Sequence, residues 1–567
     1  MVAMLLICAG TFLTGCSKDK EAGTTPTGSE APGKLVVSVL GVADVEDITP
    51  AEQKANAAGK LTIKQDEVLS SKVMSFKGFD AVVDLQRNTL GGAKVAIKGL
   101  GKGSGNVAGQ MAAAVANGVK YRLLLYKRDG SFYSSTVLTS GQAATVTVET
   151  PVTYDWYAYS YNSTEEPENV NPSNPALVLP AGKDVLYAKG SITLSDEKAG
   201  SNNTLGIIFK HRLARVGIEV NTMGMFADMS SLGVSVTGLS VRTGTLNLRT
   251  GALSNLNTVT QTINQNNFVD AEPPYKDRKI AYFYTADSVT RLNALQVSVN
   301  ALALTLDNGS TRTFSQLVTA PSRFTFDVTP RIGASYNALI NLIESPVTFG
   351  SVSWARANLY YHSAPRNRYR FSHTNAPTRD RNTYFSYGSV NPENYGYNSD
   401  PCLLVYPQGV WRMPTQNEFV TLTGILGIRP PSEYGVVNGA GYIEYRNTTG
   451  TSAPYPSNYL RFNMNGQGNT VSVLNDVVTI DATSTYGTSA NYWSSTNLLD
   501  LGIINAGAYF FRGTRESLLG SPYNLTNTDQ ELLNIGLLGS VNVAKTNFKN
   551  IRCVRATSTA PTPDLAP

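Results

Sequence analysis

Cysteine is the residue type in this chain with the clearest chemistry, because its thiol can carry a lipid, form a disulfide or bind a metal. The 567 residues include four cysteines and three histidines. Cys16 ends the stretch Leu13-Thr14-Gly15-Cys16, which follows the apolar run 4–10 and precedes polar residues. This order is typical of a bacterial lipoprotein signal that is cut before the cysteine. We therefore expect a signal peptide and lipobox at 1–16, with lipid attached to Cys16.

The signal itself leaves an alternative open. Its apolar run is too short to span a bilayer, which takes about 20 apolar residues. An ordinary signal peptide with a chance cysteine is the other interpretation, and Met1-Val2-Ala3 lacks the usual positive charge, as if translation began upstream. With lipid, each buried CH2 group would contribute about 0.8 kcal/mol to membrane binding. The chain would then be exported as an outer-membrane lipoprotein precursor.

The other cysteines predict a cross-link. Cys8 lies in the signal, so Cys402 and Cys553 are left as an even pair in an oxidising compartment. Two free buried thiols are the alternative. A disulfide would close a loop of 151 residues (553 minus 402) and contribute about 5 kcal/mol in the chain-entropy model. Three histidines are too few to suggest a histidine-based metal or catalytic site, so we expect no metal, no cofactor and no enzymatic activity.

Composition narrows the class of protein further. Charged residues make up 16% and the net charge is +5, whereas a nucleic-acid binder would cluster basic residues. We expect no nucleic-acid partner. The 29 tyrosines and 49 glycines favour strands and tight turns over helices. The length suggests two or three domains.

Strands are predicted through most of the first 345 residues, because short apolar runs and period-two alternation recur between turn signals. Residues 17–33 are a flexible polar linker before the first of them, and 42–72 are a polar surface excursion with weak pattern. Asp307-Asn308-Gly309 predicts a hairpin turn. The strands are expected at Lys34 to Leu40, Tyr121 to Tyr126, Ala144 to Glu149, Tyr154 to Tyr161, Leu205 to Phe209, Arg215 to Val220, Val234 to Val241, Ile280 to Tyr284, Gln296 to Leu306 and Phe324 to Val328.

One predicted strand carries an aromatic stripe. Tyr157, Tyr159 and Tyr161 share a face. Such a stripe could bind sugar, but core and cross-strand packing is the favoured interpretation.

A family resemblance appears in the same half of the chain. Asp184-Val-Leu-Tyr-Ala-Lys189, Leu205-Gly-Ile-Ile-Phe-Lys-His-Arg-Leu-Ala-Arg215 and Pro330-Arg-Ile-Gly-Ala-Ser-Tyr336 resemble motifs of the Bacteroidales fimbrillin-like (type V pilin) family. The resemblance covers about 34–345. It implies two tandem transthyretin-like β-sandwiches, at 34–190 and 191–345, and gives His211 no catalytic role; we expect that histidine to be buried and hydrogen-bonded.

The resemblance also implies partners and a maturation step. Such proteins join other fimbrial subunits by β-strand addition, after a protease removes the first strand and opens a groove. Here that strand is Leu35 to Leu40. Lys54, Lys60 and Lys64 are candidates for a lysine-specific cut, and Arg87 is a less favoured candidate because it abuts the predicted strand 81–85.

From Pro346 the sequence changes character. Trp354-Ala-Arg-Ala-Asn-Leu359, Asp400-Pro-Cys402, Trp411-Arg-Met-Pro-Thr-Gln-Asn-Glu418, Tyr492-Trp-Ser-Ser-Thr496 and Arg552-Cys-Val-Arg555 resemble, in order and spacing, the Fibrobacter-succinogenes-type major domain. The resemblance covers 346–557 and implies a mixed α/β, C-type-lectin-like fold with its first and last segments paired.

Several residues of this half have expected roles. Thr415 and Glu418 form a capping box that predicts a helix start. Trp411 and Trp493 are expected to be core anchors rather than sugar platforms. The calcium-dependent sugar motifs of true C-type lectins do not occur in the sequence.

These features together predict an accessory, tip subunit of a cell-surface fimbria that presents 346–557 for adhesion to a glycan or protein ligand. The tail 558–567 contains three prolines, which pair badly as a strand, so the chain could accept a strand but not donate one. The alternatives are an outer-membrane lipoprotein that binds glycan or matrix protein without entering a fibre, and a base anchor that keeps its lipid.

Overall fold

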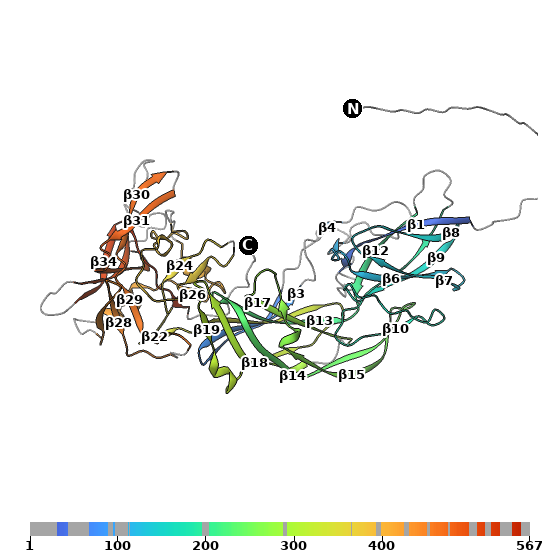
Figure 1. Ribbon diagram of the computed structural model, residues 1–567, viewed down its shortest axis with the longest axis horizontal. Coiled ribbons are helices and arrows are strands. Elements are labelled where there is room, and N and C mark those ends of the chain that lie inside the picture. Colours follow the sequence, from blue (N-terminus) through green and yellow to red (C-terminus); the bar gives the residue numbers. More distant parts are fainter. Residues whose placement is uncertain are drawn as a thin grey trace, which may run out of the picture.

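The computed structural model describes residues 31–43, 67–88, 95–96, 111–112, 114–195, 203–286, 292–364, 366–392, 399–424, 430–450, 454–474, 477–497, 507–515, 523–532 and 547–556. Over these residues the chain is mainly β, as its composition predicts. The strands gather into three groups along the long axis: a first sheet, a second sandwich and a C-terminal module (Figure 1). The lipobox with Cys16, the candidate cut sites Lys54, Lys60 and Lys64, and the tail from residue 557 lie outside the described residues.

The first sheet has seven strands in the order β7-β6-β9-β11-β12-β1-β8. All seven contribute side chains to one apolar core, and the two edge strands β7 and β8 contact each other. The sheet therefore curls around its own core. Its strands are β1 (Ala31–Ala43), β6 (Lys120–Lys127), β7 (Phe132–Thr139), β8 (Ala144–Thr150), β9 (Thr153–Ser160), β11 (Leu186–Thr193) and β12 (Asn203–His211), with the pair β4 (Val95–Ala96) and β5 (Met111–Ala112) forming a separate ladder.

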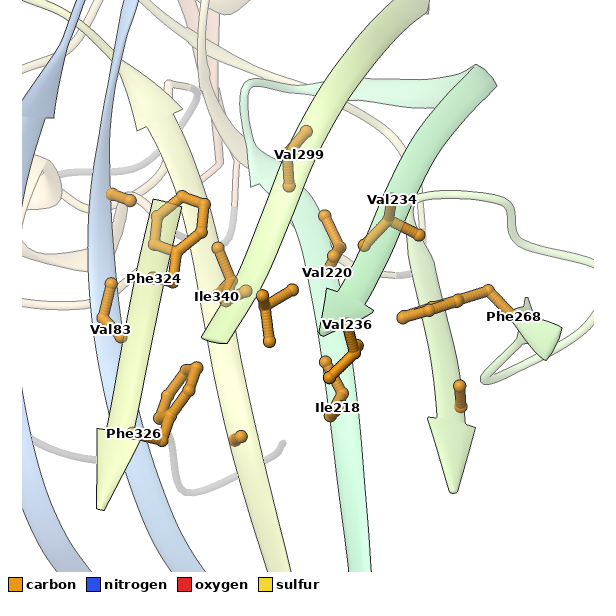
Figure 2. Close-up of a cluster of buried hydrophobic side chains, with 14 of the residues drawn as sticks. Val83, Ile218, Val220, Val234, Val236, Phe268, Val299, Phe324, Phe326 and Ile340 are labelled. Atoms are coloured by element: carbon orange, nitrogen blue, oxygen red, sulfur yellow. The ribbon is translucent and has the colours of Figure 1, made fainter. Parts of the chain in front are cut away.

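The second sandwich consists of two six-stranded sheets. One has the order β16-β17-β13-β21-β3-β2, and the other runs β10-β14-β18-β19, with β15 on β14 and β20 on β18. Figure 2 shows side chains of the two sheets, among them Ile218 and Ile340 on one and Val236 and Phe324 on the other, packed into one core. The strands are β2 (Glu67–Phe76), β3 (Phe79–Asn88), β10 (Ala176–Val178), β13 (Ala214–Gly224), β14 (Ala227–Asn247), β15 (Leu253–Asn264), β16 (Val269–Asp270), β17 (Arg278–Thr285), β18 (Leu292–Leu306), β19 (Thr311–Thr313), β20 (Ser322–Val328) and β21 (Ser335–Glu344).

Among the described residues, the C-terminal module is built from short strands, the 3-10 helices η3 (Arg381–Thr383) and η4 (Pro401–Leu404), and one α-helix, α2 (Gln416–Thr423). Its first and last strands meet in the sheet β22-β23-β36-β26. The capping box is confirmed, because Thr415 Oγ1 accepts from the Glu418 N–H while Glu418 accepts from the Thr415 N–H. The strands are β22 (Val347–Phe349), β23 (Val352–Trp354), β24 (Leu359–Tyr361), β25 (Tyr369–Phe371), β26 (Trp411–Arg412), β27 (Glu433–Val437), β28 (Ala440–Tyr445), β29 (Leu460–Asn463), β30 (Gln467–Leu474), β31 (Val477–Ser484), β32 (Ser489–Asn497), β33 (Gly507–Thr514), β34 (Asn524–Leu532), β35 (Asn547–Phe548) and β36 (Val554–Arg555).

Sheet membership divides the first half differently from the expected boundary between 34–190 and 191–345. β12, which begins at Asn203, belongs to the first sheet, whereas the hairpin of β2 and β3 joins the second sandwich through β21. Strand pairing between segments so distant in sequence leaves no local pattern. The interpretation of 42–72 as a surface excursion was wrong at both ends, since β1 continues to Ala43 and β2 begins at Glu67. β2 is an edge strand with mostly exposed side chains, which explains its weak pattern.

The aromatic stripe is confirmed as core. Tyr159 and Tyr161 are buried and pack with Leu246 and Leu248 of the second sandwich, so this face of β9 joins the first sheet to its neighbour. Within the described ranges, no helix combines the length and apolarity needed to cross a bilayer.

Candidate functional site

The candidate site is the place that β1 occupies in the first sheet. Residues Ala31–Val37 pair antiparallel with β8, and Leu35–Ala43 pair parallel with β12. From Leu35 to Val37 both edges of the strand are therefore hydrogen-bonded. Loss of β1 would leave a groove with two unpaired edges, the arrangement that accepts an added strand most strongly.

Side chains fix β1 in this groove. Leu35 and Val37 are fully buried and Val42 is 8% exposed, and all three join the core of the first sheet beside Val146 and Ile207. The alternation of a strand sends Leu35 and Val37 to the same face, toward the core. Burial of an aliphatic side chain of this size contributes about 1.5–3 kcal/mol, so much of the affinity of the groove for its strand comes from these positions.

The candidate cleavage residues fall in two different settings. Lys54, Lys60 and Lys64 lie outside the described residues, in the connection between β1 and β2. Arg87 lies inside β3, paired with Glu67 of β2 on one side and with Tyr336 of β21 on the other. A protease binds its target as an extended accessible segment, so a cut at Arg87 would require the sheet to open.

The last strand of the second sandwich is β21. β21 lies between β13 and β3 and is paired along its length with both. Only two residues separate its end from β22, which begins the C-terminal module. β21 is thus held on both edges and continued by the chain.

Ion pairs fasten the C-terminal module to the second sandwich. Arg366 donates to Glu272 and Asp277 and stacks 3.7 Å from the ring centre of Tyr275. Burial raises the pKa of Asp277, while Arg366 acts in the opposite direction. Arg370 pairs with Asp307 at 2.6 Å.

Apolar contacts reinforce the same joint. Phe226 of the second sandwich meets Phe371 of the module with ring centres 5.3 Å apart. Val82 and Ile343 belong to the same buried cluster as Trp411. The module therefore has a fixed orientation on the sandwich.

A small cleft of about 30 Å3 lies at this joint. Tyr455 sits in it with the guanidinium carbons of Arg356 and Arg312 at 3.8 and 4.6 Å from its ring centre. Burial raises the pKa of Tyr455 to about 12, so the phenol is neutral at physiological pH. The cleft lining is Arg312, Glu344, Arg356, Ala357, Ser372, His373, Asn375, Tyr455, Pro456, Ser457 and Tyr459.

The remaining predicted residues have structural roles. Cys402 and Cys553 form a buried disulfide, so the alternative of two free thiols is wrong. Trp411 and Trp493 are each 1% exposed and are core anchors, as expected. His211 is 5% exposed and its Nδ1 lies 2.9 Å from a carboxylate oxygen of Asp184.

Among the residues that the structure describes, no group of three or more His, Cys, Asp or Glu side chains is placed to hold a metal ion.

Sequence reasoning missed the partners that make the groove and the joint. β8 and β12 lie more than 100 residues from β1 in the chain, and Arg366, Glu272 and Tyr455 come from separate segments.

Comparisons with known proteins concern mainly the first half. No curated protein matches the chain. Among solved structures, a candidate cell adhesion protein of Bacteroides fragilis is 12% identical, covers 44% of this chain and 93% of its own, and gives a TM-score of 0.27. The fimbrial anchor protein Mfa2 of Porphyromonas gingivalis is 10% identical, covers 46% and 88%, and gives 0.20.

A fimbrial assembly protein of Parabacteroides distasonis is 10% identical, covers 39% of this chain and 82% of its own, and gives a TM-score of 0.20. Likeness at these scores carries no argument about function. A family model described as fimbrillin-like matches residues 104–343, which is less than half of the chain. The relationship to the fimbrillin-like family thus belongs to residues 104–343, which include most of the first sheet and most of the second sandwich.

Proposed function

We propose that the chain is an accessory, tip subunit of a cell-surface fimbria, which accepts a strand from a neighbouring subunit and presents residues 346–557 for adhesion. The observation that carries the proposal is the setting of β1. It is an interior strand, paired with β8 and β12, and it is joined to the rest of the chain through residues 44–66. The fimbrillin-like match of 104–343 supports assembly with other fimbrial subunits.

The proposal also explains why such a subunit would end a fibre. β21 is paired on both edges and runs into the C-terminal module. Residues 558–567 contain three prolines, which cannot donate main-chain hydrogen bonds. In this proposal a subunit whose β21 is held on both edges, and whose residues 558–567 pair badly as a strand, accepts a strand without donating one and stops growth.

In this proposal the C-terminal module is the adhesive part, with a C-type-lectin-like fold, and residues 34–345 form two transthyretin-like sandwiches. The size and two-part layout resemble accessory fimbrial proteins of the FimE type. In this proposal a glycan or protein ligand binds the surface around the small cleft beside Tyr455. Lipid on Cys16 would hold the precursor at the outer membrane until a cut in the segment that contains Lys54, Lys60 and Lys64 frees β1.

N-terminal sequencing of protein from sheared fibres tests the assembly role. A start after Lys54, Lys60 or Lys64 is the expected result, and it would mean that β1 has left the groove. A protein that is absent from fibres and begins at lipidated Cys16 would contradict the proposal and favour a surface lipoprotein that binds its ligand alone.

The adhesive role is tested by applying the full chain to arrays of glycans and matrix proteins. Binding that is lost in Tyr459→Ala, and retained in a control variant far from the cleft such as Tyr133→Phe, would place the ligand at the joint. If no array member is bound, the module is a structural cap and its adhesive role is refuted.

A further inference from the structure

Two glycines of β1 occupy positions where a side chain would be rejected. A Cβ atom on Gly33 would lie 2.6 Å from Thr150 Cγ2 and 3.1 Å from Thr150 Oγ1. Real Cβ contacts are essentially never that short, so the threonine would have to move. Thr150 is 2% exposed and β-branched, and its χ1 angle is therefore stiff. The groove admits glycine at this point and little else.

Gly41 is required for a different reason. Its φ angle is +151°, which L side chains rarely adopt. It follows a bulge, because the register against β12 moves from Val39 opposite Ile207 to Gly41 opposite Ile208. The extra residue reverses the alternation, so the inward positions change from Leu35 and Val37 to Val42.

From these positions we infer that the groove selects its strand by sequence: a glycine, apolar residues two and four positions later, a second glycine eight positions after the first, and an apolar residue directly after that. The inference rests on the proposed strand exchange. The incoming strand would run antiparallel to β8 and parallel to β12, since those are the directions that β1 takes. Selection by a clash at the first glycine excludes wrong strands as well as favouring the right one.

The pattern also says which partner is excluded. Residues 547–567 of this chain contain no glycine and three prolines, Pro561, Pro563 and Pro567. That segment cannot place glycines against Thr150 and at the bulge. The strand that fills the groove would therefore be a Gly-x-Φ-x-Φ-x-x-x-Gly-Φ segment, where Φ is apolar, and not the C-terminal segment of a second copy.

The test uses the full chain with a specific protease site inserted between residues 44 and 66. After cleavage, fluorescent peptides with the sequence of residues 31–43 compete for the groove, and their binding is followed by anisotropy and native mass spectrometry. We expect the natural peptide to exchange in, and the G33V peptide to bind at least 10-fold more weakly. The K34V peptide is the matched control and should stay within about 2-fold, because that side chain is exposed.

A complementary change sharpens the result. Thr150→Ala removes the two atoms that a Cβ at position 33 would meet, so this chain should accept a G33A peptide that the natural chain rejects. If G33V binds as well as the natural peptide, sequence selection at this position is refuted and strand exchange stands. If even the natural peptide fails to enter, the proposed strand exchange itself is refuted. Should Thr150→Ala fail to fold, the peptide series on the natural chain still decides.

Discussion

The first described strand of the chain and its last one, β1 and β36, are both interior strands, yet they are held by different forces. β1 contributes main-chain pairing and apolar side chains such as Leu35 and Val37. β36 follows directly after Cys553, which is bonded to Cys402, and after Arg552, which is fully buried.

A buried charge is a second difference between β36 and β1. Arg552 donates to Asn358, to Asn375 and to main-chain oxygens of Ala355 and Arg461. Burial lowers its pKa to about 10. A strand held by backbone and methyl groups can be replaced by another strand of the same pattern. A strand anchored by a covalent bond and a buried charge cannot leave without leaving polar groups unsatisfied.

Removal of the disulfide should have the largest effect. In C402A/C553A the free energy of unfolding of the C-terminal module should fall by about 5 kcal/mol, because a loop of 151 residues is no longer closed. Hydrogen exchange read peptide by peptide checks this, with the first sheet of the same sample as the internal control. Equal loss of protection in β1 and β36 would show that the two ends are not held separately.

Truncation of a buried side chain in β1 should destabilise the first sheet. Leu35→Ala removes a fully buried side chain and should cost about 3 kcal/mol in the first sheet. Val36→Ala is the matched control on the opposite face, half-buried, and should cost less than about 1 kcal/mol. Denaturant unfolding and hydrogen exchange measure both. Loss confined to the C-terminal module would contradict the assignment of this core.

Loss of an ion pair at the joint between the second sandwich and the module should lower stability by an intermediate amount. Arg366→Ala leaves Asp277 and Glu272 without this cation, and we expect a loss of about 2 kcal/mol. Faster hydrogen exchange in 272–278 and 366–371 is the readout. Lys183→Ala, which breaks an exposed ion pair with Glu165 (side chains 40% and 52% exposed), should change stability by less than about 1 kcal/mol. Similar losses of stability for the two substitutions would mean that the ion pairs of the joint contribute no more than an exposed surface pair.

Substitution of two tyrosines in the core of the first sheet should have the smallest effects, with opposite signs. The Tyr121 hydroxyl is buried and has no hydrogen-bond partner in the described part of the chain, whereas the Tyr154 hydroxyl accepts from the Glu149 N–H at 3.0 Å. Tyr121→Phe should therefore raise the free energy of unfolding by about 1 kcal/mol, and Tyr154→Phe should lower it by about 1 kcal/mol. Urea unfolding at pH 8 measures both, and the same sign for both would contradict the argument.

The same pair has a predicted pH dependence. Burial raises the pKa of each of Tyr121 and Tyr154 to about 12. Above pH 10 the unfolded chain releases these protons while the folded chain keeps them, so stability falls as pH rises from about 10 to 12. The advantage of Tyr121→Phe should then grow by about 1 kcal/mol between pH 8 and pH 11. An unchanged difference in urea unfolding would mean that the phenol titrates normally.

Local features of the sequence were predicted well where they depend on neighbours in the chain. The hairpin at Asp307-Asn308-Gly309 forms, with Gly309 at φ +78°. The capping box at Thr415 is present. The pairing of Cys402 with Cys553 followed from compartment and count, because only two cysteines remained.

Features that depend on distant partners were not predictable. The hairpin of β2 and β3 follows β1 in sequence and yet joins another sheet, because hydrogen bonds to β21 satisfy its inner edge. Nothing in the periodicity of β3 distinguishes β21 from any other partner. The cleft beside Tyr455 likewise depends on arginines from β19 and from the start of the C-terminal module.

The sequence by itself determined that this chain is mainly β, that Lys34 to Leu40 form a strand, and that two cysteines remain to pair. These follow from side-chain period and composition, which each segment carries alone. Only the tertiary structure decided that β1 lies between β8 and β12, that Thr150 faces Gly33, and that β21 has no free edge. The reason is physical: main-chain hydrogen bonds are the same for every strand, so the choice of partner depends on how whole faces pack together.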